Sequence, residues 1–479
     1  MKSKPFLLAA AVVVALAAIG GAWSWQRAGA VAAQVDAARP AVPDLTSAHA
    51  AFRARLAAAE QRARSRFTAR SGLAELAELY HANGFLDEAM RCYAGLELID
   101  PAEPRWPHRH ATILAGYGEI EPAMILWQRV VALAPDYLPA RLRLGDCELK
   151  ANQPAKAAAT YATVLARDPA NTYAQLGLAR LEVEAGRWDA ARPRLEKLVA
   201  DTNYTLGYDL IVTLYERTGQ HDRALAIRGA AKASGAYRDP PDPWIDGLMD
   251  ACFDTYRLSL TAGAIARAGD PETGQRLLER ALELSPLDVS SHFQLGLLAV
   301  ERGNFSLARS ELVRCTQLAP DFADPWAHLS GLQQRLGDAT GAAETLATGL
   351  AHCPESPGLH LMRARQLQAA HRSGEAIVEY QTSIRFRPNE PDAYLELGRV
   401  YFDLNRIDEG MAQFEQALAT DPGEPVALGV LTLHAIQIGD QPAARQWMAR
   451  VANQPRLRAD LVNKLATAYR QQFGRDWQP

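Results

Sequence analysis

Four aspartates recur at every fourth position near the middle of the chain, at Asp242, Asp246, Asp250 and Asp254. Residues four apart lie on one face of an α-helix, so this spacing predicts a stripe of carboxylates. Such a stripe fits a solvated helix face, a docking surface for a basic partner, or a divalent-cation site. The cation site fits least, because calcium takes about six to eight oxygen ligands and a single helix rarely supplies them.

A second set of candidate ligands consists of His81, His108 and Glu78. Imidazole and carboxylate groups bind zinc, but isolated surface histidines are commoner than two-histidine sites. The five cysteines lie far apart and show no CxxC spacing, which favours small buried side chains over a zinc or haem site. We therefore expect no metal and no cofactor.

The sequence motifs of common enzymes are absent. The chain contains no GxxxxGK(S/T), HExxH or GxSxG motif, and no stretch outside the pattern described below is long enough for a catalytic domain. The net charge of -4 gives no general attraction to nucleic acid. The sequence thus predicts a non-enzymatic protein with no catalytic residues, no small-molecule substrate and no nucleic-acid partner.

A repeat of 34 residues organises most of the chain. Prolines recur at this spacing in two series, and small and bulky residues precede them at fixed distances of twelve and eight positions. The prolines are Pro101, Pro135 and Pro169, then Pro286, Pro320, Pro354, Pro388 and Pro422. The small residues include Ala89, Ala123, Ala157, Ala308, Ala342 and Ala376, and the bulky ones include Tyr93, Trp127, Tyr161, Leu312, Leu346, Tyr380 and Phe414.

This spacing predicts pairs of amphipathic helices, each about 12 to 14 residues long. A glycine or asparagine joins the two helices, because these residues tolerate left-handed backbone angles. The expected turn positions are Gly84, Gly118, Asn152, Gly269, Gly303, Gly337 and Asn405. Proline ends the second helix, and neighbouring pairs must stack because no single pair buries its apolar face alone.

The pattern, with tyrosines at Tyr80 and Tyr401 in the first helix, resembles the tetratricopeptide repeat family over about residues 70–455. The resemblance implies an all-α fold, a right-handed α-solenoid of helix-turn-helix repeats, and an interaction scaffold rather than a specific activity. It also implies that first helices line a groove for a protein or peptide partner. The groove residues expected to bind it are Phe293, Leu297, Leu361, Arg365, Leu395, Arg399 and Phe402.

The amino terminus predicts a membrane anchor. Lys2 and Lys4 precede an uncharged stretch from Pro5 to Trp25, about the 20 residues that a bilayer requires. The flanking lysines favour an inside amino terminus, and therefore a single-pass membrane protein with the bulk of the chain in a periplasm. The alternative is a signal peptide cleaved near residues 28–30, with secretion to the periplasm.

The predicted organisation follows from these features. Residues 1–26 form the transmembrane anchor or signal peptide, and 27–69 a basic linker or helix. Repeats occupy 70–237 and 255–457, and residues 458–479 form a capping helix and tail. Between the two series, residues 238–257 are surplus to the repeat: Asp242 and Pro243 suit the start of a helix, which we expect to run unbroken into the repeat at 255.

The function predicted from the sequence is a scaffold that mediates protein–protein interactions outside the cytoplasm. The alternative is an accessory subunit of a separately encoded enzyme or of an envelope export or assembly complex. Residues 238–257 are either a binding element or a structural bend.

Overall fold

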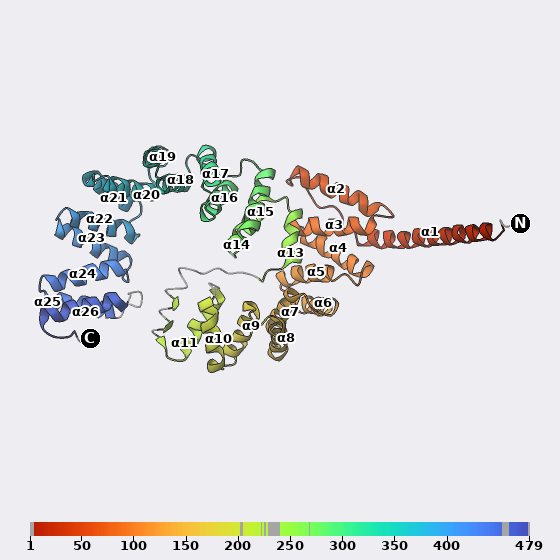
Figure 1. The fold of residues 1–479 in the computed structure, drawn as a ribbon, viewed down its shortest axis with the longest axis horizontal. Helices are drawn as coiled ribbons and strands as arrows, with labels where there is room; N and C mark the ends of the chain where they lie inside the picture. The colour runs from red at the N-terminus through yellow and green to blue at the C-terminus, as the bar shows by residue number, and fades with distance from the viewer. Residues whose placement is uncertain are drawn as a thin grey trace. The chain divides into compact units, whose positions relative to one another are not determined.

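The computed structural model describes residues 4–201, 205–221, 223–224, 227–228, 240–267, 269–452 and 459–477. Of residues 4–18, 201, 205 and 459 the backbone alone is described. All regular structure in these ranges is helical, and successive helices form antiparallel pairs (Figure 1). The predicted all-α fold of helix-turn-helix repeats is confirmed.

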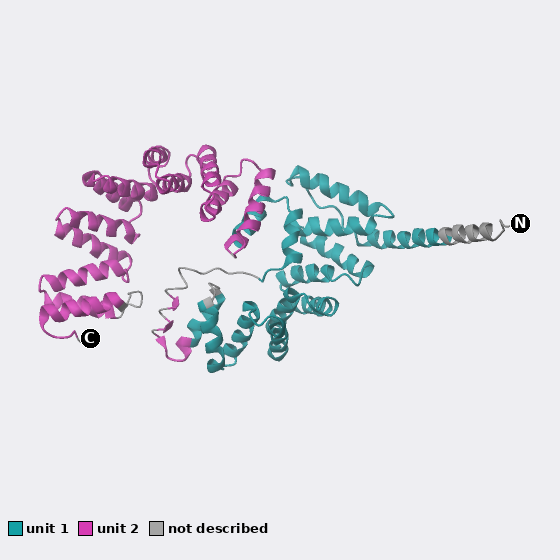
Figure 2. Cartoon of the chain, viewed as in Figure 1, with its two compact units in different colours: residues 1–214, 236–264 teal, residues 215–235, 265–479 magenta. Residues whose placement is uncertain are grey.

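The chain divides into two compact units, residues 1–214 with 236–264, and residues 215–235 with 265–479 (Figure 2). The helices up to the middle of the chain are α1 Lys4–Ala38, α2 Ala50–Arg64, α3 Ala69–Ala82, α4 Leu86–Ile99, α5 Arg105–Gly116, α6 Ile120–Leu133, α7 Leu138–Lys150, α8 Pro154–Arg167, α9 Thr172–Glu184, α10 Trp188–Asp201, α11 Thr205–Arg217, α13 Pro243–Asp246, the 3-10 helix η1 Gly247–Ala251, and α14 Thr255–Arg267. The helices that follow are α15 Pro271–Leu284, α16 Val289–Glu301, α17 Phe305–Leu318, α18 Ala323–Arg335, α19 Ala339–His352, α20 Pro357–Ala369, α21 Ser373–Phe386, α22 Pro391–Asp403, α23 Ile407–Thr420, α24 Pro425–Gln437, α25 Gln441–Ala452 and α26 Ala459–Phe473.

The repeat positions identified in the sequence form the core. The small residues twelve positions before each proline and the bulky residues eight before it are almost completely buried. The close approach that small residues permit is clearest at Gly145 and Gly177, where an added Cβ would lie 2.7 Å and 2.5 Å from the ring of Tyr161. All seven expected turn residues have positive φ, including Asn152 and Asn405, so these turn predictions are confirmed.

A regular hydrogen bond, not predicted from the sequence, closes the loop between successive pairs. The side chain six positions after a repeat-ending proline donates an N–H to that proline's carbonyl oxygen, with nitrogen–oxygen distances of 2.9 to 3.2 Å. The donors are Arg141, Gln175, His292, Trp326 and His360. Because different residue types share this role, no single-letter pattern reveals it.

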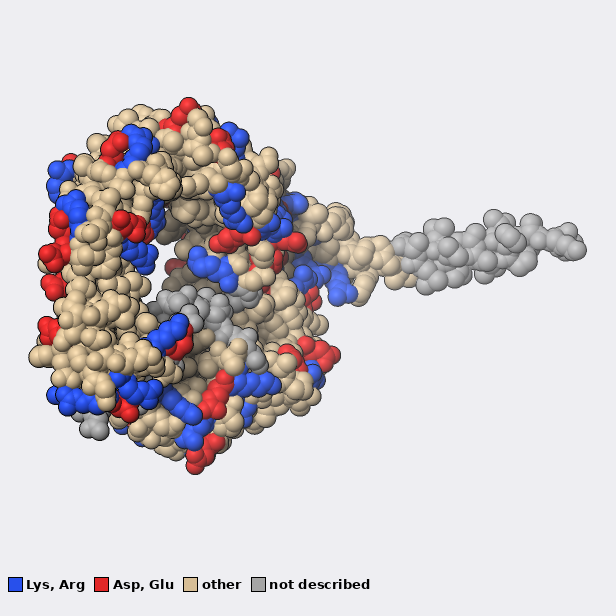
Figure 3. All heavy atoms as spheres, turned by 60° about the vertical axis from the view of Figure 1, so that its left-hand side comes forward, with Lys and Arg blue, Asp and Glu red and all other residues tan. Residues whose placement is uncertain are grey.

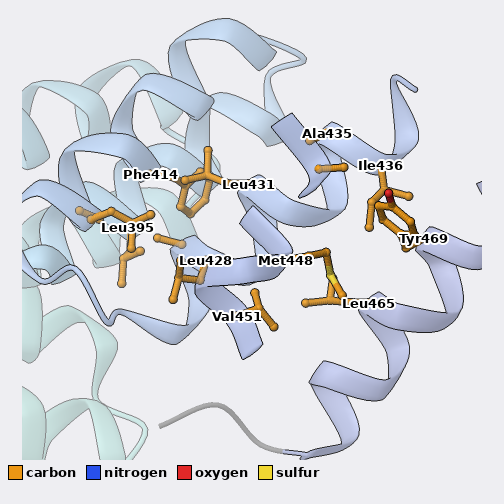
Figure 4. Packing of buried hydrophobic residues seen from close by; sticks show 14 residues of the cluster. Leu395, Phe414, Leu428, Leu431, Ala435, Ile436, Met448, Val451, Leu465 and Tyr469 are labelled. Atoms are coloured by element: carbon orange, nitrogen blue, oxygen red, sulfur yellow. The ribbon is translucent and has the colours of Figure 1, made fainter. Parts of the chain in front are cut away.

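At the two ends, additional helices cover exposed edges of the repeats. In the first unit, the carboxyl-terminal part of α1 packs on α3 and α4, and Val35 is fully buried. In the second unit, Leu465 and Tyr469 of α26 close the apolar cluster that includes Met448 and Ile436 (Figure 4). Burying such a face is what the end of a repeat array requires.

The predicted anchor at residues 1–26 falls mostly on residues whose side chains lie outside the described part of the structure. Across the part that is described, no helix combines the length and apolarity needed to cross a bilayer.

The expectation of an unbroken helix from Asp242 into the repeat at 255 is wrong. Helix α13 ends at Asp246, η1 follows, and the backbone is extended at Cys252 (φ -81°, ψ 135°) before α14 begins. The side-chain amide of Asn83 bonds both backbone groups at this break: it donates to the carbonyl of Ala251 (2.9 Å) and accepts from the N–H of Phe253 (2.7 Å). In a continuous helix the carbonyl of Ala251 and the N–H of Phe253 would bond to other backbone groups of that helix. Here the side chain of Asn83, at the end of α3, takes the place of those partners.

Candidate functional site

Residues 240–254, which we refer to as the strap, lie across the first helices of the early repeats in the first unit. Its α13 lies beside α5 (Figure 1), and η1 packs on α3. The contacts come from positions that first helices present to a groove, among them His108 of α5. The strap therefore occupies the groove formed by α3, α5 and α7.

The centre of this contact is a buried hydrogen-bond network around Asp242. Its two carboxylate oxygens bond separately, Oδ2 to Nε2 of His108 at 2.8 Å and Oδ1 to the hydroxyl of Tyr137 at 2.6 Å. His108 is 0% exposed and Asp242 is 2% exposed. Arg143 adds a positive charge, with its Nε 4.0 Å from Oδ2. The carboxylate is thus bonded by two donors and faced by a cation.

The neighbouring tryptophan fixes which nitrogen of His108 carries the proton. The indole N–H of Trp127 lies 3.2 Å from Nδ1 of His108. Because an indole can only donate, Nδ1 accepts and Nε2 donates to Asp242. Burial acts to raise the pKa of Asp242, but its interactions with His108, Tyr137 and Arg143 together outweigh burial and hold that pKa below its usual value.

Trp244 forms the second anchor of the strap. Its ring stacks on Tyr137, with centroids 3.6 Å apart and an interplanar angle of 9°, and meets His108 edge-on. Its backbone is also bound, because the N–H donates to the hydroxyl of Tyr137 (3.0 Å) and the carbonyl accepts from Nε of Arg109 (2.9 Å). Arg109 is held in turn by Glu78, at 2.6 Å.

A cavity of about 410 Å³ continues the same groove beyond the strap. Pro240, at the start of the strap, forms part of its wall. Its lining combines apolar and charged side chains: Ala115, Trp127, Leu142, Arg143, Asp146, Cys147, Leu149, Lys150, Tyr161, Tyr173, Leu176, Gly177, Arg180, Leu206, Asp209 and Leu210. This combination is typical of a site for a side chain or short peptide.

Asp146 and Tyr161 form the buried polar contact of the cavity, with Tyr161 donating its hydroxyl to Oδ1 of Asp146 at 2.5 Å. Burial raises the pKa of both groups, and the Tyr161 hydrogen bond acts against the shift at Asp146. The basic residues Arg143, Lys150 and Arg180 lie around this pair. The cavity therefore offers three basic side chains and one buried carboxyl group that already accepts a hydrogen bond from Tyr161.

The second unit has a larger hollow, of about 860 Å³, beside α17. Phe305, Arg309, Ser310 and Arg314 are part of its lining, and half of the lining residues are exposed. Its polar pairs include His292 with Glu311 and Arg314 with Gln317, and His292 also closes a repeat loop through the carbonyl of Pro286, as described above. The cavity in the first unit is therefore the stronger candidate site.

The predicted acidic stripe does not form, because the helix that would carry it ends at Asp246. Asp242 is buried against His108, while Asp246 accepts a hydrogen bond from the backbone N–H of Asp242 (3.0 Å). Asp250 is exposed on η1. Asp254 lies just before α14, where it accepts from the N–H of Arg257 (3.1 Å). The four carboxylates therefore have four different environments.

The predicted groove residues all lie on first helices of the second unit. Phe293 and Leu297 belong to α16, Leu361 and Arg365 to α20, and Leu395, Arg399 and Phe402 to α22. Phe293 packs against Phe322 and Phe402 against Phe414, while Leu395 is buried in the core. Arg365 makes a two-pronged ion pair with Glu396, and Arg399 is exposed. Their partner-binding role stays a prediction.

The candidate metal ligands are separated. Nδ1 of His81 lies 3.1 Å from the hydroxyl of Tyr93, and burial lowers the pKa of His81 to about 3. His108 instead bonds Asp242, and Glu78 bonds Arg109. Within the described ranges, no group of three or more histidine, cysteine, aspartate or glutamate side chains could hold a metal ion.

On the face drawn in Figure 3, basic and acidic side chains are interspersed rather than gathered by sign. Such a mixed surface produces no extended positive potential that would attract a polyanion such as nucleic acid.

Comparison with known families identifies the repeat. Residues 149–203 match one family model described as Tetratricopeptide repeat, and residues 266–321 and 358–425 match a second model with the same description. Among solved structures, yeast Tom70 aligns over 85% of this chain and 97% of its own, with 14% identity and a TM-score of 0.40.

Similar curated proteins include two from bacterial cellulose synthase operons. The chain is 31% identical to cellulose synthase 2 operon protein C of Komagataeibacter xylinus over 30% of this chain and 11% of that protein. It is 27% identical to cellulose synthase operon protein C of Xanthomonas axonopodis pv. citri (strain 306), over 47% of this chain and 15% of that protein. DnaJ homolog subfamily C member 3 of Rattus norvegicus is 22% identical over 57% of this chain and 47% of its own length. The chain thus spans less than half the length of each of these relatives.

Proposed function

Because the chain is a tetratricopeptide repeat protein, we propose that it is a non-enzymatic scaffold that holds a protein partner in the groove of its first unit. The observation that carries this proposal is the cavity of about 410 Å³ between α7, α9 and α11. Its apolar lining residues suit one or two side chains of a peptide, and Arg143, Lys150 and Arg180 suit an acidic neighbour.

A site-specific photo-crosslinker tests this proposal. Leu206 lines the cavity and is 38% exposed, so a photoreactive residue there reaches a bound partner. Leu98 of α4 is 79% exposed in the same unit and outside the cavity lining, and it serves as the matched control. We expect a defined crosslinked partner from position 206 only, and its loss in the Arg180→Glu variant. Equal capture from both positions would refute a groove-specific scaffold.

A second candidate function is an accessory subunit of a separately encoded enzyme. The similarity to the cellulose synthase operon proteins of two bacteria favours it, and a cellulose-synthesising assembly is then the partner to test first. Co-purification of the full chain with the synthase of its own host measures this directly. Absence of the synthase from crosslinked complexes would leave the general scaffold as the better description.

For location, we propose that residues 1–26 anchor the chain in a membrane and that its bulk lies in the periplasm, with cleavage and release as the alternative. The lysine-flanked apolar stretch from Pro5 to Trp25 supports this proposal. Fractionation and protease accessibility in intact and permeabilised cells test it. Protection of the repeats after the outer envelope is opened would contradict a periplasmic location.

A further inference from the structure

The strap contacts the groove of α3, α5 and α7 in the manner of a bound peptide. We propose that this groove is a recognition site for a segment that presents a carboxylate two residues before an indole, and that a partner segment of this chemistry displaces the strap. The proposal rests on the scaffold function above, and it adds the chemistry of the partner and the means of its control.

The first observation is that the groove binds the strap through groups that any peptide carries. The N–H and carbonyl of Trp244 bond Tyr137 and Arg109, and the carbonyl of Ala251 and N–H of Phe253 bond Asn83. Main-chain bonds of this kind give affinity without depending on sequence, so another chain can form the same ones.

Specificity comes from the carboxylate and the ring. His108 and Tyr137 donate to the two oxygens of Asp242, and the Trp244 ring stacks on Tyr137. An occupant without the carboxylate would leave the buried N–H of His108 without an acceptor, which is costly. The groove therefore discriminates in favour of an acidic residue followed by an aromatic one.

The strap has only two short helices of its own. Its α13 is four residues long and η1 is five, and extended backbone follows. A segment with so few internal hydrogen bonds is ordered mainly by the surface on which it lies, because a single helical turn is unstable in isolation. Releasing it breaks its groove contacts while leaving the bonds within α3, α5 and α7 intact.

The neighbouring cavity gives a partner a place to begin. Pro240 of the strap forms part of its wall, and Arg143 both lines it and faces Asp242. The cavity therefore borders the start of the strap in the same unit, and a peptide bound in it would lie beside Pro240. Extension of that peptide along the groove would compete directly with Asp242 and Trp244.

A peptide with the strap's own sequence is the probe. The full chain carrying Asp242→Ala and Trp244→Ala together has a weakened strap, and a fluorescent peptide of residues 238–258 is added to it. We expect binding by anisotropy at least tenfold tighter than to the unmodified chain. Asp242→Ala or Trp244→Ala in the peptide should each weaken binding at least tenfold, whereas Tyr256→Ala, at an exposed position, should not.

The result that overturns the proposal is a folded double variant, judged by its helical circular dichroism, that binds the peptide no better than the unmodified chain does. If the variant does not fold, hydrogen exchange of the unmodified chain decides. Strap amides at 244 and 253 should exchange at least tenfold faster than amides in the middle of α5 and α7. Exchange at the same rate as these helices would make the strap an inseparable part of the fold. If position 206 captures no partner but the double variant still binds the peptide, the scaffold function is refuted and this recognition site is not.

Discussion

Replacing Asp242 by alanine removes the acceptor that His108 and Tyr137 share. Each donor then loses a charge-assisted hydrogen bond of 2.8 or 2.6 Å, at a site where Asp242 is 2% exposed. An unsatisfied buried donor costs about 1–3 kcal/mol, and part of this is offset because no charge has to be desolvated. We expect a net loss of about 2–4 kcal/mol in strap docking, and about 1–2 kcal/mol for Asp242→Asn, which keeps one carbonyl oxygen.

Hydrogen exchange at the amide of Trp244 measures this loss, because that N–H bonds the hydroxyl of Tyr137. A loss of 2–4 kcal/mol corresponds to an exchange rate about 30 to 1,000 times faster. Leu98→Ala, at an exposed position of α4, is the control and should leave the rate unchanged. Protection in Asp242→Ala within about threefold of the unmodified chain would refute the assignment of Asp242 as the anchor.

The same network has a defined pH dependence. The pKa of Asp242 lies below its ordinary value of 3.8 in the folded chain, so folding favours the ionised carboxyl. Its contribution is therefore fully present above pH 3.8 and is lost as the pH falls through the lower, folded value. The difference in the free energy of strap docking between the unmodified chain and Asp242→Ala should shrink in that acid range and stay constant above it.

Three further predictions concern the repeats. Gly177→Ala places a methyl group 2.5 Å from the ring of Tyr161 and should lower the free energy of unfolding by about 1–3 kcal/mol in urea titrations, whereas Gly358→Ala, with open space around it, should not destabilise. Tyr161→Phe removes the hydrogen bond to Asp146 and should raise the pKa of that carboxyl further, as an NMR titration of the Asp146 side chain would show; an unchanged pKa would contradict the bond. Arg365→Ala breaks an exposed ion pair with Glu396 and should change stability by no more than about 1 kcal/mol in the same urea assay; a larger loss would give this pair a role in the core.

The repeat made most of the fold predictable. Each helix pair packs on its neighbours in sequence, so the residues that form a contact lie within about one repeat length of each other. The proline spacing therefore located the buried alanines, the aromatic residues beside them, and turns such as Asn152 and Asn405.

The candidate site was only partly predictable. From the sequence, His108 was a candidate metal ligand and Asp242 the start of a helix, but the two residues were not paired. Tyr137, Trp244 and Asn83 were missed, because nothing in their local sequence distinguishes them from ordinary packing or turn residues. The predicted carboxylate stripe depended on a helix that the structure does not contain.

The sequence by itself determined the repeat, because its physics is local: helix periodicity, turn residues and neighbour packing all act over about 34 residues. Only the tertiary structure determined the conformation of the strap and the groove in which it lies. His108 and Asp242 are 134 positions apart, and Asn83 and Phe253 are 170 apart. Helical spacing favours a continuous helix from Asp242, but groove donors and acceptors bond its backbone and side chains in a different conformation. Contacts of such long sequence separation override a local preference, and no local pattern records them.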